Sequence, residues 1–189
     1  MTRRALLLSA LSLCAASCRR EPKVSVRRQT VPAPMPTGSD VVTIVEFSDA
    51  GERTTVSQID RVEKTEEEWR EQLSVLSYTV TREEGTERPF TGPLLKEHRA
   101  GIFRCICCET AVFASETKFD SGTGWPSFWQ PIAPENISEE IDQSWGMTRT
   151  AVSCARCSAH LGHVFTDGPR PTGLRYCINS AAMIFVARA

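Results

Sequence analysis

Cys105-Ile-Cys-Cys108 and Cys154-Ala-Arg-Cys157 are the stretches that decide the fold, because they place two Cys-x-x-Cys pairs in one chain. Four thiolates at this spacing can hold one Zn²⁺ tetrahedrally, and such a closed site serves structure rather than chemistry. The gap of 45 residues between the pairs exceeds that of a usual zinc ribbon and has room for a large insertion. The alternatives are two disulfides in an exported protein, or redox motifs, although no thioredoxin-like βαβ pattern surrounds either pair.

Around these pairs, short β-branched and aromatic runs alternate with Gly, Pro and Asp. The runs expected to form strands are 41–47, 54–59, 102–106, 111–113, 148–152, 163–165, 174–178 and 183–186. A capping box at 65–68 and apolar residues at helical spacing predict a helix over 65–76 and a short one over 78–84. We therefore expect a mainly β fold, a twisted sheet or open barrel, with helices packed outside it.

Length and composition exclude several classes of protein. The chain has 189 residues, which suits one domain with appendages, and its net charge of -1 gives no field that favours nucleic acid. No apolar run reaches the roughly 20 residues of a membrane-spanning helix, so a multi-pass membrane protein is excluded. Four Trp, eight Phe and an apolar fraction of 41% exclude a wholly disordered chain.

The N-terminus has the pattern of an export signal. Arg3 and Arg4 precede a short apolar run that ends in small residues before Cys18, which resembles a lipobox. The two arginines fit either a twin-arginine signal or an ordinary positive n-region. We expect an exported protein, periplasmic or anchored in the membrane by a lipid on Cys18. The Pro- and Arg-rich residues after it predict a tether.

The predicted organisation has four parts, and the role of the third is left open by the sequence. They are a signal peptide over 1–17, a tether over 18–40, a β-hairpin extension over 41–62 and a folded domain over 63–189. The hairpin can pack on the domain or serve a partner, and the sequence does not distinguish the two.

Cys177 lies in Arg175-Tyr-Cys-Ile-Asn179, which reads as a strand. Because side chains alternate along a strand, Arg175, Cys177 and Asn179 share one face, and Tyr176 and Ile178 point into the core. A guanidinium beside a thiol favours the thiolate and lowers its pKa. Cys177 is therefore a candidate nucleophile, and the alternative is a buried cysteine in a core strand.

His160 and His163 are two of only three histidines, and they follow the second Cys pair closely. Four cysteines already fill the coordination sphere of a zinc ion, so ligation by these imidazoles is less attractive, and surface positions are the other alternative. An imidazole titrates near neutrality and can give a proton to a reaction at Cys177. The third, His98, stands in a polar stretch and is expected to be exposed.

Two further features complete the candidate site. Trp125 stands in a loop that two glycines and Pro126 make tight, so it can form the wall of a small apolar pocket or simply belong to the core. Cys107 lies inside the first Cys pair with the wrong spacing for a pair of its own. It is either a buried apolar filler or a spare thiol.

In this order, the motifs resemble those of methionine sulfoxide reductase B, the peptide-methionine (R)-S-oxide reductase family. The resemblance covers about residues 64–189. The matching stretches are Gly85-Thr-Glu-Arg-Pro-Phe-Thr-Gly92, Thr117-Lys-Phe-Asp-Ser-Gly122, Gly124-Trp-Pro-Ser-Phe128, Cys154-Ala-Arg-Cys157, His160-Leu-Gly-His-Val-Phe165 and Gly173-Leu-Arg-Tyr-Cys-Ile-Asn-Ser180. The fold it implies has two antiparallel sheets, tent-like or as an open barrel, with peripheral N-terminal helices.

The resemblance implies a reductase of methionine-R-sulfoxide in oxidised proteins, in which Cys177 attacks the sulfoxide sulfur and becomes a sulfenic acid. It implies that His160 and His163 bind and protonate the sulfoxide oxygen. It further implies that Arg175 stabilises the thiolate and that Asn179 and Asp167 are polar groups that surround the reacting residues. It implies that Trp125 contacts the ε-methyl group of the oxidised methionine. The family's structural zinc ion would be held by Cys105, Cys108, Cys154 and Cys157.

Two positions depart from the family pattern. Thr123 stands where many members carry a resolving cysteine, so we expect a thioredoxin-like or other thiol reductant to reduce Cys177 directly, and Cys107 is the only spare thiol of the domain. Trp145 stands where many relatives have a polar or basic residue, with no clear consequence. The alternative function is a zinc-stabilised peptide-binding module without catalysis, although such a module needs no nucleophile.

Overall fold

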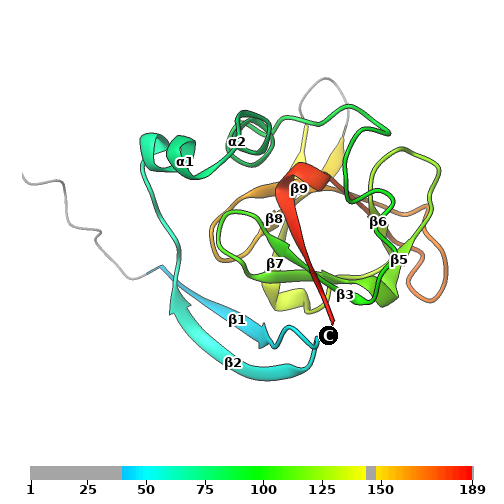
Figure 1. Cartoon of the computed structure of the whole chain (residues 1–189), viewed down its shortest axis with the longest axis horizontal. Coiled ribbons are helices and arrows are strands. Elements are labelled where there is room, and N and C mark those ends of the chain that lie inside the picture. Colours follow the sequence, from blue (N-terminus) through cyan, green and yellow to red (C-terminus); the bar gives the residue numbers. More distant parts are fainter. Residues whose placement is uncertain (1–39, 144–147, 189) are drawn as a thin grey trace, which may run out of the picture. The chain divides into compact units, whose positions relative to one another are not determined.

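The computed structural model describes residues 40–143 and 148–188 (Figure 1). The predicted signal segment, Cys18, residues 18–39 of the tether and Trp145 lie outside the described residues. Among those that are described, no helix is both long and apolar enough to cross a membrane.

Antiparallel sheets form the body of the molecule, as the sequence predicts. The larger sheet has the order β5-β6-β10-β9-β8-β7, and the smaller one has the order β11-β3-β4. The strands of the larger sheet are β5 (Lys118–Phe119), β6 (Ser127–Phe128), β7 (Ile137–Asp142), β8 (Arg149–Cys154), β9 (His160–Phe165) and β10 (Arg175–Ile178). The smaller sheet consists of β3 (Gly101–Cys105), β4 (Ala111–Ala114) and β11 (Met183–Ala187). Short 3₁₀ turns are η1 (Ser115–Thr117), η2 (Pro134–Asn136) and η4 (Ser180–Ala182).

Aromatic side chains fill the space between the two sheets. Phe113 on β4 stacks on Phe128 of β6 with ring centroids 4.4 Å apart, and Phe103 on β3 meets Phe128 edge-on at 5.0 Å. Tyr176 on β10 packs against Phe113, and Ile178 is fully buried. Each such side chain contributes about 1.5–3 kcal/mol by burial. The inward face predicted for β10 is thereby confirmed.

The two helices, α1 (Glu66–Gln72) and α2 (Val75–Arg82), begin at well-formed N-caps. The predicted capping box is present, because Thr65 and Glu68 each accept a hydrogen bond from the other's backbone amide. The predicted boundaries were wrong at the junction. Ser74 caps α2 through a 3.0 Å bond from the amide of Ser77, so α1 ends early and Leu76 is half exposed.

The N-terminal strands β1 (Val41–Phe47) and β2 (Arg53–Asp60) pair antiparallel as predicted. Asn136 is fully buried and bonds both backbone groups of Val45 at 2.8 Å, while also donating to the carbonyl of Ala111 at 2.7 Å. Arg61, just after β2, donates to the carbonyl of Ala155. The hairpin therefore packs on the domain.

Candidate functional site

The four cysteines of the two Cys-x-x-Cys pairs come together in one cluster. Their sulfur atoms all lie within 4.8 Å of one another, with Cys105 and Cys157 at 3.7 Å and Cys108 and Cys154 at 3.5 Å. A tetrahedron with Zn–S bonds of about 2.3 Å has sulfur–sulfur edges of roughly 3.8 Å. The donor set and its dimensions therefore fit one zinc ion, and no disulfide forms among the described cysteines.

Cys107 is the buried cysteine inside the first pair, and it belongs to the hydrophobic core. It is 4% exposed, and its carbonyl accepts a hydrogen bond from Gln72. Of the two alternatives for Cys107, this placement favours the filler.

Cys177 lies near the centre of the larger sheet, on β10. Its register partners are His163 on β9 and Ser127 on β6. Gly162 on β9 leaves no room for a side chain, because a Cβ there would press against the Cys177 carbonyl. This close approach fixes the strand that carries the candidate nucleophile directly against the strand that carries the histidines.

Burial dominates the electrostatics of Cys177 and raises the pKa of its thiol. Hydrogen bonding by Thr123, the charge of Arg175 and hydrogen bonding by Ser127 each lower the pKa, but they do not outweigh burial. The predicted direction of the Arg175 effect is correct, whereas a net lowered pKa was the wrong expectation. Strand alternation in the sequence predicts the guanidinium beside Cys177, which lowers the pKa of the thiol. It does not predict the burial, which raises that pKa.

Arg175 is held in place from two sides. Its Nε and Nη2 atoms each donate to the Asp167 carboxylate at 2.9 Å, and its guanidinium stacks over Phe165 at 4.3 Å. Asp167 stands on the exposed loop after β9, with 64% of its side chain accessible. Asp167 therefore positions the guanidinium and does not line the cavity at Cys177.

His160 and His163 face the same side of the sheet although strand alternation places residues three apart on opposite faces. A bulge in the β8–β9 pairing pairs Val152 with Gly162 and Ser153 with His160, which adds one residue on β9. The two imidazole centroids are consequently 5.2 Å apart. The bulge is what brings the predicted histidine pair together.

The two imidazoles have different surroundings. His163 shares a 2.9 Å hydrogen bond between Nε2 and the carboxylate of Asp142, which also accepts from Arg149 at 2.8 Å. Burial and the neighbouring His163 lower the pKa of His160 to about 4, so this imidazole is neutral at neutral pH. Asp142 and Arg149 were missed by sequence reasoning, because they belong to no local motif and reach His163 only through strand pairing.

Trp125 is tied to the end of β10 through Glu87, a second residue that the sequence did not single out. The indole Nε1 donates to the Glu87 carbonyl at 3.1 Å, while the Glu87 amide donates to Asn179 Oδ1 at 3.0 Å. The buried Glu87 carboxylate accepts from the amides of Ser180 and Ala181. Its only sequence signal was its place in the motif 85–92.

A small cavity of about 110 Å³ brings most of the predicted residues together. It is lined by Thr86, Trp125, Arg149, Gly162, His163, Phe165, Cys177 and Asn179. Two aromatic rings and a thiol beside an imidazole suit a compact apolar group that carries one polar oxygen. The predicted His160 instead lines a neighbouring cavity.

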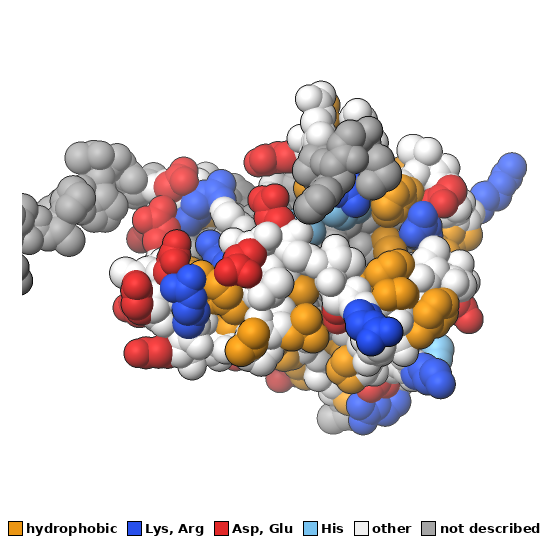
Figure 2. Space-filling view, turned by 90° about the horizontal axis from the view of Figure 1, so that it is seen from above, with side chains coloured by type: hydrophobic (Ala, Val, Ile, Leu, Met, Phe, Trp, Pro, Cys, Tyr) orange, Lys and Arg blue, Asp and Glu red, His pale blue; other side chains and the backbone are white. Residues whose placement is uncertain are grey.

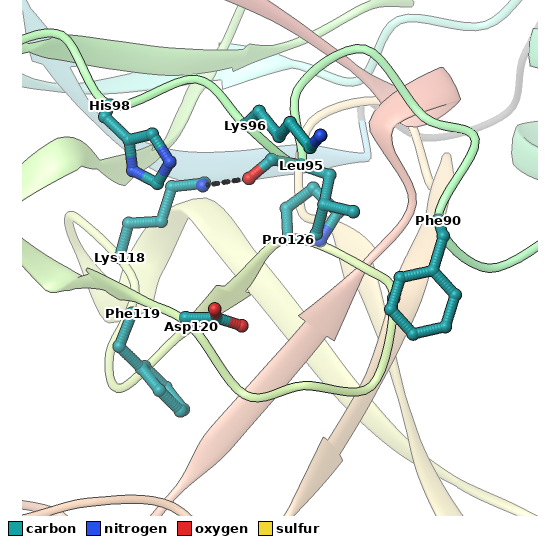
Figure 3. Close-up of a pocket in the computed structure, with 9 residues that line it drawn as sticks. Phe90, Leu95, Lys96, His98, Lys118, Phe119, Asp120 and Pro126 are labelled. Carbon is teal, nitrogen blue, oxygen red and sulfur yellow. Dashed lines mark hydrogen bonds between the residues drawn. The ribbon is translucent and has the colours of Figure 1, made fainter.

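A separate cavity of about 380 Å³ holds none of the predicted catalytic residues (Figure 3). Phe90, Phe119 and Pro126 line it, and the ammonium of Lys118 donates to the Leu95 carbonyl at 2.8 Å. His98 lines it as well and is exposed, as expected.

Comparison with known proteins agrees with this geometry. The SelR domain family matches residues 73–187. The curated proteins named peptide methionine sulfoxide reductase MsrB include relatives from Hahella chejuensis (56% identical, covering 67% of this chain and 91% of the relative), Bradyrhizobium diazoefficiens (59%, covering 66% and 89%) and Pseudomonas putida strain W619 (57%, covering 69% and 98%). The two Cys pairs, the histidine pair and the Cys177 strand all lie inside the matched residues, so the chain belongs to the SelR-domain family of MsrB methionine sulfoxide reductases.

Proposed function

We propose that this protein reduces methionine-R-sulfoxide in oxidised proteins to methionine, with Cys177 as the nucleophile. The observation that carries the proposal is the cavity in which Cys177, His163 and Trp125 meet. The names of the relatives support the same reaction. A binding module without catalysis would gain nothing from a cysteine at this place.

In the proposed reaction, the Cys177 sulfur attacks the sulfoxide sulfur, and the sulfoxide oxygen passes to Cys177. The thiol and the sulfoxide thereby become a sulfenic acid and methionine, so the methionine sulfur is reduced and the cysteine sulfur is oxidised. Trp125 and Phe165 would contact the ε-methyl group, and Asn179 adds a polar group to the same cavity. Arg175, positioned by Asp167, would stabilise the thiolate.

Of the two histidines, we propose His163 as the proton donor to the sulfoxide oxygen. Asp142 fixes this ring through Nε2, which leaves Nδ1 for the substrate. His160, with its lowered pKa, is a neutral imidazole at neutral pH and would donate its one N–H as a hydrogen bond to the substrate without transferring the proton.

Recycling needs two thiols from outside the chain. The first attacks the sulfenic acid, releases water and forms a mixed disulfide with Cys177, and the second then releases the Cys177 thiol. A thioredoxin-like protein supplies both thiols. Thr123 has no thiol to offer, and Cys107 is buried beside the Cys105 cluster.

We further propose that Cys105, Cys108, Cys154 and Cys157 hold one structural zinc ion, supported by their all-sulfur donor set. We also propose that the protein is exported and that Cys18 carries a lipid, on the basis of the N-terminal sequence pattern.

The test uses the full chain with dithiothreitol and separated R and S epimers of a methionine sulfoxide peptide. Reduction of the R epimer alone, lost in Cys177→Ser, is the expected result. Failure of zinc-loaded, folded protein to reduce either epimer contradicts the proposal and favours the binding module.

A further inference from the structure

A second cavity adjoins the cavity of Cys177. It measures about 390 Å³ against about 110 Å³ for the first. Thr86, Arg149 and His163 line both, so the two cavities meet at these residues. The smaller one has room for a methionine sulfoxide side chain but not for the polypeptide that carries it.

The larger cavity is acidic. Glu83, Glu84 and Asp142 line it together with one cation, Arg149. Arg149 and His163 already engage Asp142, whereas the exposed Glu83 and Glu84 form no ion pair among the described residues. Figure 2 views the molecule from the side on which α1 and α2 lie, and it shows Asp and Glu side chains gathered over these helices.

Glu83 and Glu84 stand where the local structure disfavours them. Glu83 is the C-cap of α2, and the C-terminal end of a helix carries a partial negative charge that repels carboxylates. Glu84 follows with φ of 55°, a left-handed conformation that favours glycine. Residues that break local rules without compensation inside the fold point to a role toward a ligand.

His160 gives an independent sign of a ligand in the same cavity. Its side chain is 4% exposed, and its Nε2 has no hydrogen-bond partner among the described residues. A buried polar nitrogen without a partner destabilises the fold, and a hydrogen bond with a bound group relieves this cost. An extended peptide supplies such groups from its backbone.

We propose that this larger cavity receives the polypeptide next to the oxidised methionine, and that Glu83 and Glu84 select substrates with Lys or Arg beside that methionine. The inference rests on the proposed reductase function and deepens it to a substrate class. The carboxylates act by attraction in binding, so they affect KM rather than kcat.

The test compares three peptides that differ only in the two residues flanking methionine-R-sulfoxide. Both flanking residues are Lys in the first peptide, Gln in the second and Glu in the third. With the full chain at low salt, the Lys peptide should exceed the Glu peptide about fivefold in kcat/KM, the size of an exposed charge interaction. The Gln peptide should fall between them. The difference should shrink at about 0.5 M salt, where screening shortens the range of the attraction.

The decisive variant is Glu83→Gln with Glu84→Gln, matched by Glu67→Gln with Glu71→Gln on α1, which removes the same charge outside the cavity. We expect the difference in kcat/KM between the Lys and Glu peptides to disappear only in the double variant of Glu83 and Glu84. That variant should still reduce the Gln peptide at the rate of the unsubstituted protein. Glu84→Gly provides a second variant that folds readily at this backbone angle and should halve the effect.

The outcomes separate this inference from the proposed function. Equal rates for the three peptides, or a loss of discrimination in the Glu67 and Glu71 control, overturn the charge selection alone. No reduction of even the Gln peptide overturns the reductase function itself.

Discussion

The Thr123 hydroxyl lies 3.8 Å from the sulfur of Cys177. Ser121 connects it to Ser127, with oxygen–oxygen distances of 2.8 and 2.7 Å. Hydrogen bonding by Thr123 lowers the pKa of Cys177 against the effect of burial. Where the family pattern suggests a resolving thiol, this chain places a hydroxyl within reach of the nucleophile.

Thr123→Cys should therefore convert the enzyme to internal resolution. After one turnover without reductant, the introduced thiol is expected to condense with the Cys177 sulfenic acid, release water and form a disulfide. Mass spectrometry should find two hydrogens lost in the variant, and one oxygen gained on Cys177 in the unsubstituted protein. A sulfenic acid that accumulates equally in both would contradict the proximity of these two side chains.

His160 should make the folded state sensitive to mild acid. Its pKa is about 4 in the folded protein against an ordinary 6.5, so the unfolded state takes up the proton first as the pH falls. Stability present at pH 7 is thus lost between about pH 6.5 and 4, by about 3 kcal/mol in unfolding free energy. Urea unfolding at both ends of this range measures it.

His160→Gln provides the control for this pH effect, because both proteins lose metal from their thiolates in acid. The variant should show an acid loss about 3 kcal/mol smaller. An identical pH dependence in the two proteins would mean that folding does not lower the pKa of His160.

Asp142→Asn should slow the reaction by freeing the His163 ring. His163→Gln is expected to lower kcat about 10²-fold or more, the usual contribution of a general acid, and Asp142→Asn by a smaller factor. Asp60→Asn removes an equal charge from exposed β2 and should leave kcat unchanged. Steady-state kinetics with the R epimer decide this, and an unaffected Asp142→Asn would refute the positioning role.

Sequence reasoning found the features that depend on local spacing. The two Cys pairs predict a metal cluster because ligand geometry is encoded within four residues, and alternation along Arg175–Asn179 predicts the face of the nucleophile. Features set by tertiary structure were not visible. Asp142 reaches His163 only through the pairing of β7, β8 and β9, and the burial that raises the pKa of Cys177 has no sequence signature.

The same limit explains the histidine pair and the helix boundary. Spacing alone puts His160 and His163 on opposite faces of a regular strand, and the β8–β9 bulge that reunites them follows no recognisable motif. The side chain of Ser74 caps α2, so α1 ends before it although the apolar pattern continues. From the sequence, a serine here could cap a new helix or lie within a continuing one, and the two outcomes are close in energy.

Cys154→Ser should abolish metal binding and folding together. Cys154 is fully buried and contributes one of four sulfurs to the cluster, and binding of a structural zinc is itself a large share of folding free energy. Metal analysis and circular dichroism should show less than one zinc per chain and no cooperative melting. Cys107→Ser, outside the cluster of four, should retain the metal, and its loss there would redefine the ligand set.

Asn136→Ala should detach the N-terminal hairpin without harming the catalytic site. The substitution leaves the amide and carbonyl of Val45 and the carbonyl of Ala111 without their side-chain partner in a fully buried place. At about 1–3 kcal/mol for each stranded group, after partial relaxation, we expect a loss of about 3 kcal/mol. In a chain of this size, Tm then falls by about 10 °C.

Gln58→Ala on exposed β2 should change Tm little. Because Asn136 does not line the cavity of Cys177, kcat/KM below the transition should stay unchanged, and accelerated hydrogen exchange at the Val45 amide should reveal the detached strand.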